Sequence, residues 1–379
     1  MMRWNADQKA LREGLRHWHE ALSAGHIERD AAAAFPYEQW KLIQRTGILG
    51  LPFDEQWGGL GQSLLTTMYV LEELGAGCRD GGLNFSVATH MVSVGVPLQR
   101  FGSPALKQRY LPGICSGGTI GAHAITEPES GSDALAMRTT ATREGEDFVL
   151  RGGKCFVSNG PVADVFVVYA RTHPDGGPLG ITAFLVERDT PGLTVGAPVG
   201  KMGLRTSPLG DLYFDDCRIP ASAVVGRIGS GFLVLDHVMK WEILCSFVIN
   251  AGQMGHRLER CVEHARTRTQ FGRPIGANQA VAHRIVDMRT GLETARKWLY
   301  DTARRLTDGE NVTTDVATSK LLTSESNVAS AQAAVQIFGG QGYLTECGLE
   351  KDLRDATAST LYSGTSEIQR NRIASMLGL

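Results

Sequence analysis

The spacing of apolar side chains divides the chain into three stretches. From residue 1 to about 116, apolar residues recur every three or four positions, and the nearly uncharged run LNFSVATHMVSVGVPLQRFG predicts a buried helix. From about 117 to 222, short runs rich in Val, Phe, Tyr and Thr alternate with Gly- and Pro-containing turns, which predicts the strands of a β-barrel or sandwich. From 223 to 379, four long segments with helical spacing return, as expected for an antiparallel bundle.

Composition and charge mainly exclude certain classes of protein. The 379 residues are 42% hydrophobic and 21% charged, which is ordinary for a globular protein of two or three domains. A net charge of −2 and a pI near 6.6 give no reason to expect binding to nucleic acid or to an anionic membrane. No apolar run reaches the ~18 residues that span a bilayer, and the charged N-terminus does not look like a secretory signal.

The cysteines and the glycine-rich motif further limit the kinds of site that we expect in the chain. The seven cysteines are odd in number and widely spaced, with no CxxC pair. This favours free thiols over a disulfide framework or a zinc site, so we expect a cytoplasmic protein without a bound metal. FGGQGY (338–343) is rich in glycine, but it lacks the GxGxxG spacing of a dinucleotide-binding loop.

One carboxylate stands out in the stretch 237–255, HVMKWEILCSFVINAGQMG, which contains no proline and has apolar residues at helical spacing. Glu242 lies within it, with mostly apolar or small residues one turn away on either side. Burying an ionised carboxylate without a partner costs several kcal/mol. Two interpretations follow: a glutamate at the edge of a buried face that reaches water or the nearby Lys240, or a functional carboxylate.

Five short motifs occur along the chain. They are AITEPESGSD (124–133), KCFVSNG (154–160), RTQFGRPIGANQAV (268–281), QIFGGQGY (336–343) and YSGTSEIQR (362–370). Together they resemble the signatures of the acyl-CoA dehydrogenase family over almost the whole chain, with Ser130 where the family usually has Ala and Phe156 where it has Trp. The resemblance implies an α+β fold made of an N-terminal helical domain (1–116), a middle β-barrel domain (117–222) and a C-terminal four-helix bundle (223–379).

The resemblance also implies FAD as the cofactor. Thr126 would hydrogen-bond the pyrimidine end of the isoalloxazine ring, Phe156 would stack on its face, and Ser158 would reach towards N5. Without the resemblance, these residues belong to plain turns, a core aromatic position and a strand end. The other positions expected to contact FAD are Ser132, Arg268, Phe271, Gln279, Gln336, Gly339, Gly340, Thr365 and Glu367.

Arg268 would pair with the FAD pyrophosphate, because a guanidinium presents its donors to phosphate oxygens in a fixed fork. In the family, the residues that match Arg268 and Gln279 reach the FAD of a neighbouring subunit. The resemblance therefore implies a homotetramer, arranged as a dimer of dimers. Taken alone, an arginine in RTRTQ would belong to a solvated helix face.

The catalytic base is where the chain departs from many relatives. They carry it as the glutamate of a YEGT motif, but this chain has Ser363 there, and a serine cannot remove the proton at neutral pH without a further base. Isovaleryl-CoA dehydrogenase and related enzymes carry the base on the first long helix of the C-terminal domain, and the matching residue is Glu242. Ser363 would still offer its backbone N–H to the thioester carbonyl, and Ser132 and Gly364 complete the expected substrate contacts.

The implied reaction is α,β-dehydrogenation of an acyl thioester, with the α-proton removed by Glu242 and hydride passed to flavin N5. Arginines that many relatives use near the pantetheine or CoA are replaced by Ile243 and Ser375, which favours an acyl or aminoacyl group on a carrier protein over free CoA. The expected electron acceptor is an electron-transfer flavoprotein or oxygen. Two alternatives are a flavin-dependent monooxygenase or oxidase on the same fold, and a non-enzymatic binding module.

Overall fold

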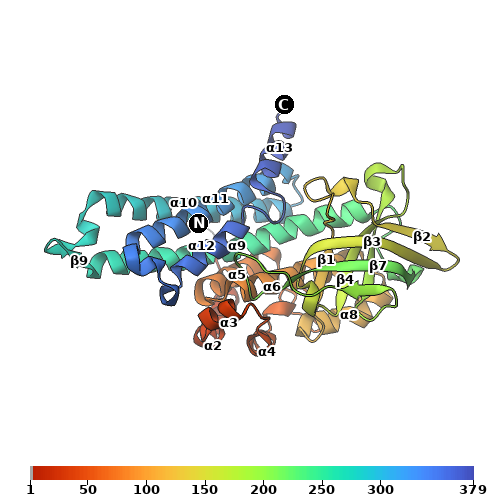
Figure 1. Ribbon diagram of the computed structural model, residues 1–379, viewed down its shortest axis with the longest axis horizontal. Coiled ribbons are helices and arrows are strands. Elements are labelled where there is room, and N and C mark those ends of the chain that lie inside the picture. The colour runs from red at the N-terminus through yellow and green to blue at the C-terminus, as the bar shows by residue number, and fades with distance from the viewer. Residues whose placement is uncertain (1–2) are drawn as a thin grey trace.

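The computed structural model describes residues 3–379 and has three regions in chain order (Figure 1). A sheet lies at one end of an elongated molecule, long C-terminal helices extend to the other end, and the N-terminal helices pack along one side. The predicted order of helical, sheet and helical regions is confirmed. The domain boundaries at 116/117 and 222/223 stay predictions.

The N-terminal region is helical. Its helices are α1 (Ala6–Arg16), α2 (His19–Ser23), α3 (His26–Ala32), α4 (Tyr37–Thr46), α5 (Leu64–Gly77), α6 (Gly81–His90), α7 (Val96–Phe101) and α8 (Pro104–Ser116). Asn5 begins α1 through a capping box shared with Gln8. The nearly uncharged run is almost entirely buried, as predicted, but it forms two helices joined by a π-helical turn at Met91–Gly95.

The middle region forms one eight-stranded mixed sheet. Its strands are β1 (Gly121–Ala124), β2 (Thr140–Glu144), β3 (Asp147–Ser158), β4 (Val165–Arg171), β5 (Ile181–Glu187), β6 (Leu193–Val195), β7 (Leu209–Pro220) and β8 (Val224–Val225). Their order is β6-β7-β3-β2-β4-β5-β8, and β1 pairs with β4 in parallel. The register between β3 and β7 shifts between Lys154 and Val157, so β3 carries a bulge near its end.

The C-terminal region contains the four predicted long helices and a fifth, α12, that the apolar pattern did not indicate. Its elements are α9 (Gly231–Thr267), the hairpin β9 (Thr269–Gln270) and β10 (Arg273–Pro274), α10 (Gln279–Thr307), α11 (Thr313–Phe338), α12 (Leu349–Ala358) and α13 (Ser366–Met376). The β9 hairpin lies at the end of the bundle farthest from the sheet (Figure 1).

Helices α5 and α9 approach closely because glycines lie at their crossing. A Cβ on Gly75 would lie 2.1 Å from the carbonyl oxygen of Ile249, and a Cβ on Gly252 would lie 2.1 Å from that of Glu72. Any larger residue at either position would push the helices apart. This contact fixes the position of α9, which carries Glu242.

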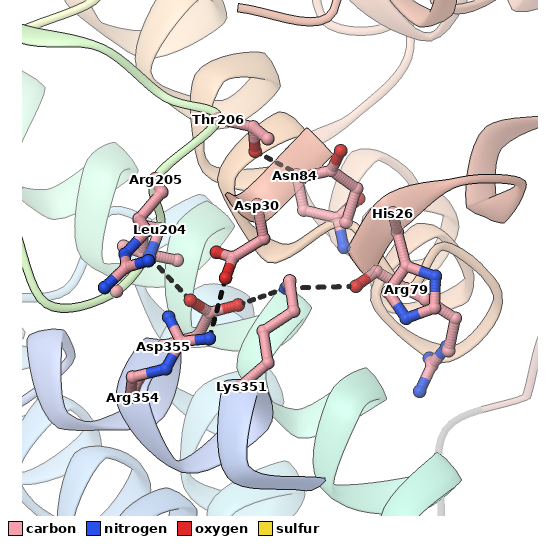
Figure 2. Close-up of polar contacts among 12 residues, drawn as sticks. His26, Asp30, Arg79, Asn84, Leu204, Arg205, Thr206, Lys351, Arg354 and Asp355 are labelled. Atoms are coloured by element: carbon pink, nitrogen blue, oxygen red, sulfur yellow. Dashed lines mark hydrogen bonds and ion pairs between the residues drawn. The ribbon is translucent and has the colours of Figure 1, made fainter. Parts of the chain in front are cut away.

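A buried ionic network joins the three regions (Figure 2). Lys351 on α12 donates to Asp355 at 2.6 Å, and Asp355 accepts the backbone N–H of Leu204 in the loop after β6 at 2.5 Å. Arg354 pairs with Asp30 on α3 at 2.7 Å. Because each charge has a partner, the network ties α3, this loop and α12 together without leaving a buried ion unpaired.

Within residues 3–379, no helix combines the length and apolar character needed to cross a membrane. No cluster of three or more His, Cys, Asp or Glu side chains in the same part of the chain is arranged to hold a metal ion.

Candidate active site

Glu242 lies in the fourth turn of α9 and is 9% exposed. The Ser363 hydroxyl donates a hydrogen bond to its Oε1 at 2.5 Å. Its Oε2 lies 3.3 Å from Nε2 of His123 on β1, although the imidazole is not aligned for a hydrogen bond. The interpretation in which Glu242 pairs with the nearby Lys240 is wrong, because Lys240 forms an ion pair with Asp236 at 2.6 Å.

The loop that carries Ser363 is held in a strained conformation. Ser363 has a φ of +56°, in the left-handed region that a residue with a side chain rarely adopts. The side-chain amide of the buried Gln369 donates to the carbonyl oxygens of Ser363 at 2.9 Å and Gly364 at 3.1 Å. The preceding Tyr362 accepts a hydrogen bond from Asn250 on α9 at 3.0 Å. These contacts hold the loop against the helix of Glu242.

A small pocket lies next to this loop. Tyr362 borders it, together with Ser246 and Asn250 from α9 and Phe85 and Ala88 from α6. Ser246 follows Glu242 by four residues, so both side chains lie on the same face of α9. The pocket therefore adjoins the face of the helix that presents the carboxylate.

The loop of the first motif packs against the end of β3. The backbone N–H of Cys155 donates to the carbonyl oxygen of Thr126 at 2.9 Å, which brings Thr126 close to Phe156. At the bulge, Phe156 has a φ of +55° and its residue is 65% exposed. The interpretation of Phe156 as a core aromatic is therefore wrong. Ser158 ends β3, and Ser132 is exposed in the loop.

A buried ion pair joins these two motifs, and the sequence reasoning missed it. Lys154 Nζ lies 2.7 Å from Glu127 Oε1 and also donates to the Ile125 carbonyl oxygen at 3.0 Å. Glu127 further accepts the backbone N–H groups of Arg138 and Thr139. The available signal was Lys154, the single charged residue of KCFVSNG, together with the three carboxylates of AITEPESGSD.

The remaining expected cofactor residues fall into two groups. Thr365 and Glu367 begin α13 directly after the Ser363 loop, and the Thr365 hydroxyl caps that helix by accepting from the Ile368 N–H at 3.3 Å. The other group lies on or beside the β9 hairpin and at the end of α11. Its members are Arg268, Phe271, Gln279, Gln336, Gly339 and Gly340, all exposed.

This second group is separated from Glu242 and Phe156 within one chain. Its hairpin lies at the opposite end of the molecule from the sheet (Figure 1), and the Phe271 residue at the hairpin tip is 99% exposed. Gln336 borders a groove between α10 and α11, together with Ala280. One chain therefore brings together Thr126, Phe156 and the Ser363 loop with the base, but not the hairpin residues.

Comparison with known proteins supplies the context for this geometry. Models of the N-terminal, middle and C-terminal domains of acyl-CoA dehydrogenases match residues 5–118, 122–217 and 229–378. An L-prolyl-[peptidyl-carrier protein] dehydrogenase from Pseudomonas fluorescens is 42% identical over 91% of this chain and 91% of its own length.

Two solved structures share the whole fold. The prolyl acyl carrier protein oxidase AnaB superposes with a TM-score of 0.97 at 38% identity, and all of each chain is covered. PigA with FAD and proline superposes with a TM-score of 0.97 at 37% identity, covering 100% of this chain and 99% of PigA.

Proposed function

The chain belongs to the acyl-CoA dehydrogenase family, and we propose that it dehydrogenates an acyl thioester with Glu242 as the general base. The observation that carries this assignment is the buried Glu242 carboxylate held by the Ser363 hydroxyl at the position where YEGT relatives carry their own base. A carboxylate in such an enclosed, partly apolar site is suited to take a proton from carbon.

The residues present fit FAD. The exposed Phe156 ring, on a left-handed residue at a bulge, offers an aromatic surface beside the Thr126 loop. We assign Thr126, Phe156, Ser158 and Ser132 to the flavin side of the site. Bound FAD would supply the acceptor for the hydride that leaves the β-carbon.

The chain's own groups bind, orient and deprotonate the substrate. The Ser363 hydroxyl holds one oxygen of Glu242, so the other carboxylate oxygen is free to take the α-proton. The strained turn at Ser363 and Gly364 presents backbone N–H groups, and the Ser363 N–H would donate to the thioester carbonyl, where negative charge develops as the proton leaves.

We assign the thioester to a carrier protein that bears an α-aminoacyl group of the prolyl type. The support is that two similar proteins are an L-prolyl-[peptidyl-carrier protein] dehydrogenase and a prolyl acyl carrier protein oxidase. Two features of this chain agree: Ile243, fully buried on α9, and Ser375, on α13, occupy positions where CoA-using relatives commonly have arginine. The seven unpaired cysteines support a cytoplasmic location.

Mass spectrometry tests the reaction directly. Purified enzyme is incubated with prolyl and simple acyl groups, each presented both on CoA and on a carrier protein, with an artificial electron acceptor. We expect the loss of two hydrogens, fastest for the prolyl carrier protein. Oxygen consumption without added acceptor distinguishes oxygen from an electron-transfer flavoprotein as the acceptor. An enzyme that oxidises none of the thioesters would contradict the assignment.

A complete FAD site also requires a second copy of the chain. Arg268 and the exposed hairpin lie away from Phe156, and we propose that they reach the FAD of a neighbouring subunit in a homotetramer. Gln279, Gln336, Gly339 and Gly340, at the same end of the bundle, would contribute to the same contact, while Thr365 and Glu367 lie by the Ser363 loop.

Replacing Arg268 by alanine is expected to weaken FAD binding about 10- to 100-fold, because a charge-assisted hydrogen bond contributes about 1.5–3 kcal/mol. Absorbance of the bound flavin during titration measures the affinity, and light scattering measures the oligomeric state. Arg304→Ala near the other end of α10, whose side chain pairs with Asp301 and Asp308, is the matched control. Equal FAD affinity in the Arg268 variant and wild type would refute the contact.

A further inference from the structure

Two polar side chains next to Glu242 are not used in the mechanism above: His123 on β1 and Tyr169 on β4. In the parallel β1–β4 pairing, His123 lies opposite Val167, so Tyr169, two residues further on, presents its side chain on the same face of the sheet. Glu242 meets His123 on that face. The base therefore faces a sheet surface that carries an imidazole and a phenol.

Each of these groups has an unused hydrogen-bonding atom. His123 Nδ1, the Tyr169 hydroxyl and Glu242 Oε2 are buried and have no hydrogen-bond partner within residues 3–379. Tyr169 is 0% exposed, so bulk water does not reach its hydroxyl. A buried polar group without a partner costs about 1–3 kcal/mol. Several such groups around one carboxylate indicate a site for a polar ligand group.

Both flanking groups are uncharged at neutral pH. Burial lowers the pKa of His123, against the opposing effect of the Glu242 charge. Burial also raises the pKa of Tyr169, and Glu242 acts in the same direction. A neutral imidazole and a phenol can each donate and accept a hydrogen bond. Their nitrogen and oxygen can accept hydrogen bonds from the N–H groups of an amine, whether or not it is protonated, whereas a methylene group offers them nothing.

We propose that His123 and Tyr169 recognise the amino group of an α-aminoacyl thioester. The inference rests on the proposed function, which places the α-carbon of the substrate at the Glu242 carboxylate. The amino nitrogen is one bond of about 1.46 Å from that carbon, so it lies close to the groups that flank the carboxylate. His123 Nε2, 3.3 Å from Glu242 Oε2, is such a group.

A purely positional role for His123 makes a different prediction. If the imidazole only held Glu242 in place, its removal would slow every substrate by the same factor. If His123 and Tyr169 bind the amine, their removal slows the aminoacyl substrate selectively. The selectivity between two substrates of the same shape therefore separates the two roles.

The test uses prolyl-CoA and cyclopentanecarbonyl-CoA, whose five-membered rings differ only by NH in place of CH₂. Wild-type enzyme is expected to prefer prolyl-CoA in kcat/KM. Tyr169→Phe and His123→Leu are each expected to lower kcat/KM for prolyl-CoA about 10- to 100-fold, with a change of less than about threefold for cyclopentanecarbonyl-CoA. Tyr213→Phe, which removes an exposed tyrosine hydroxyl from β7, is the control.

Binding of the two thioesters is measured in parallel by calorimetry under anaerobic conditions. A binding preference for prolyl-CoA that Tyr169→Phe removes supports the recognition site even if neither thioester is oxidised, and in that case the proposed reaction fails instead. Equal losses on both thioesters, or no preference in wild type, would overturn the proposal. Because Tyr169→Phe deletes a single unpartnered oxygen, it keeps the test valid if His123→Leu fails to fold.

Discussion

Replacing Glu242 by glutamine is expected to lower the rate of α,β-dehydrogenation by about 10²- to 10⁴-fold, the range that a positioned general base contributes. Glutamine keeps the shape of the side chain and can still accept the Ser363 hydroxyl hydrogen bond. However, its amide has no oxygen basic enough to take a proton from carbon. FAD content should be unchanged, because the flavin contacts lie on other elements. Acceptor-dye reduction and flavin absorbance measure the two quantities.

A matched control separates loss of the base from loss of a negative charge. Glu38→Gln on α4 removes a carboxylate whose side chain is 77% exposed and pairs only with Lys41 within the described chain. This variant should retain wild-type turnover. Wild-type turnover in Glu242→Gln would instead remove Glu242 from the mechanism.

Replacing Glu127 by glutamine is expected to destabilise the protein by about 3–5 kcal/mol, because it leaves the buried charge of Lys154 without its partner. Burial already lowers the pKa of Lys154 to about 8, although Glu127 acts in the opposite direction. Urea denaturation measures the free energy of unfolding. The double variant Glu127→Gln/Lys154→Met should recover much of the loss; a single variant as stable as wild type would show that the pair is not structural.

The same pair has a defined dependence on pH. The folded-state pKa of Lys154, about 8, is below its ordinary value of 10.5, so the unfolded chain binds more protons between these values. The contribution of Lys154 to stability therefore becomes more favourable as pH rises through that window. The pKa of Glu127 is lowered by Lys154 in spite of burial, so its contribution is present above pH 4.5 and is lost as pH falls through the folded-state value.

Local patterns predicted the helical and sheet regions well, because apolar spacing is itself the cause of burial on one face. The helix at Tyr37–Thr46 ends at Gly47, whose φ of +72° suits a residue without a Cβ. The sequence also indicated Glu242, because it is the single carboxylate in the mostly apolar stretch 237–255. In both cases, the residues that allowed the prediction lie within one or two helical turns of the feature that they predict.

Contacts between distant segments could not be predicted from local patterns. His123 and Tyr169 lie on short apolar strands, and only the β1–β4 register and the packing of α9 bring them to Glu242. Phe156 was open to misinterpretation for a related reason. A bulge changes which way the following side chains of a strand point, and hydrophobicity alone does not indicate it.

The most direct test of Glu242 as the base follows the α-hydrogen itself. A prolyl thioester deuterated only at the α-carbon is incubated with enzyme and an artificial acceptor, and the product is examined by mass spectrometry. We predict that wild type releases the α-deuterium together with one β-hydrogen, and that Glu242→Gln with full FAD content forms almost no product in the same time. A product that retains the α-deuterium, or equal release by Glu242→Gln, would contradict this account.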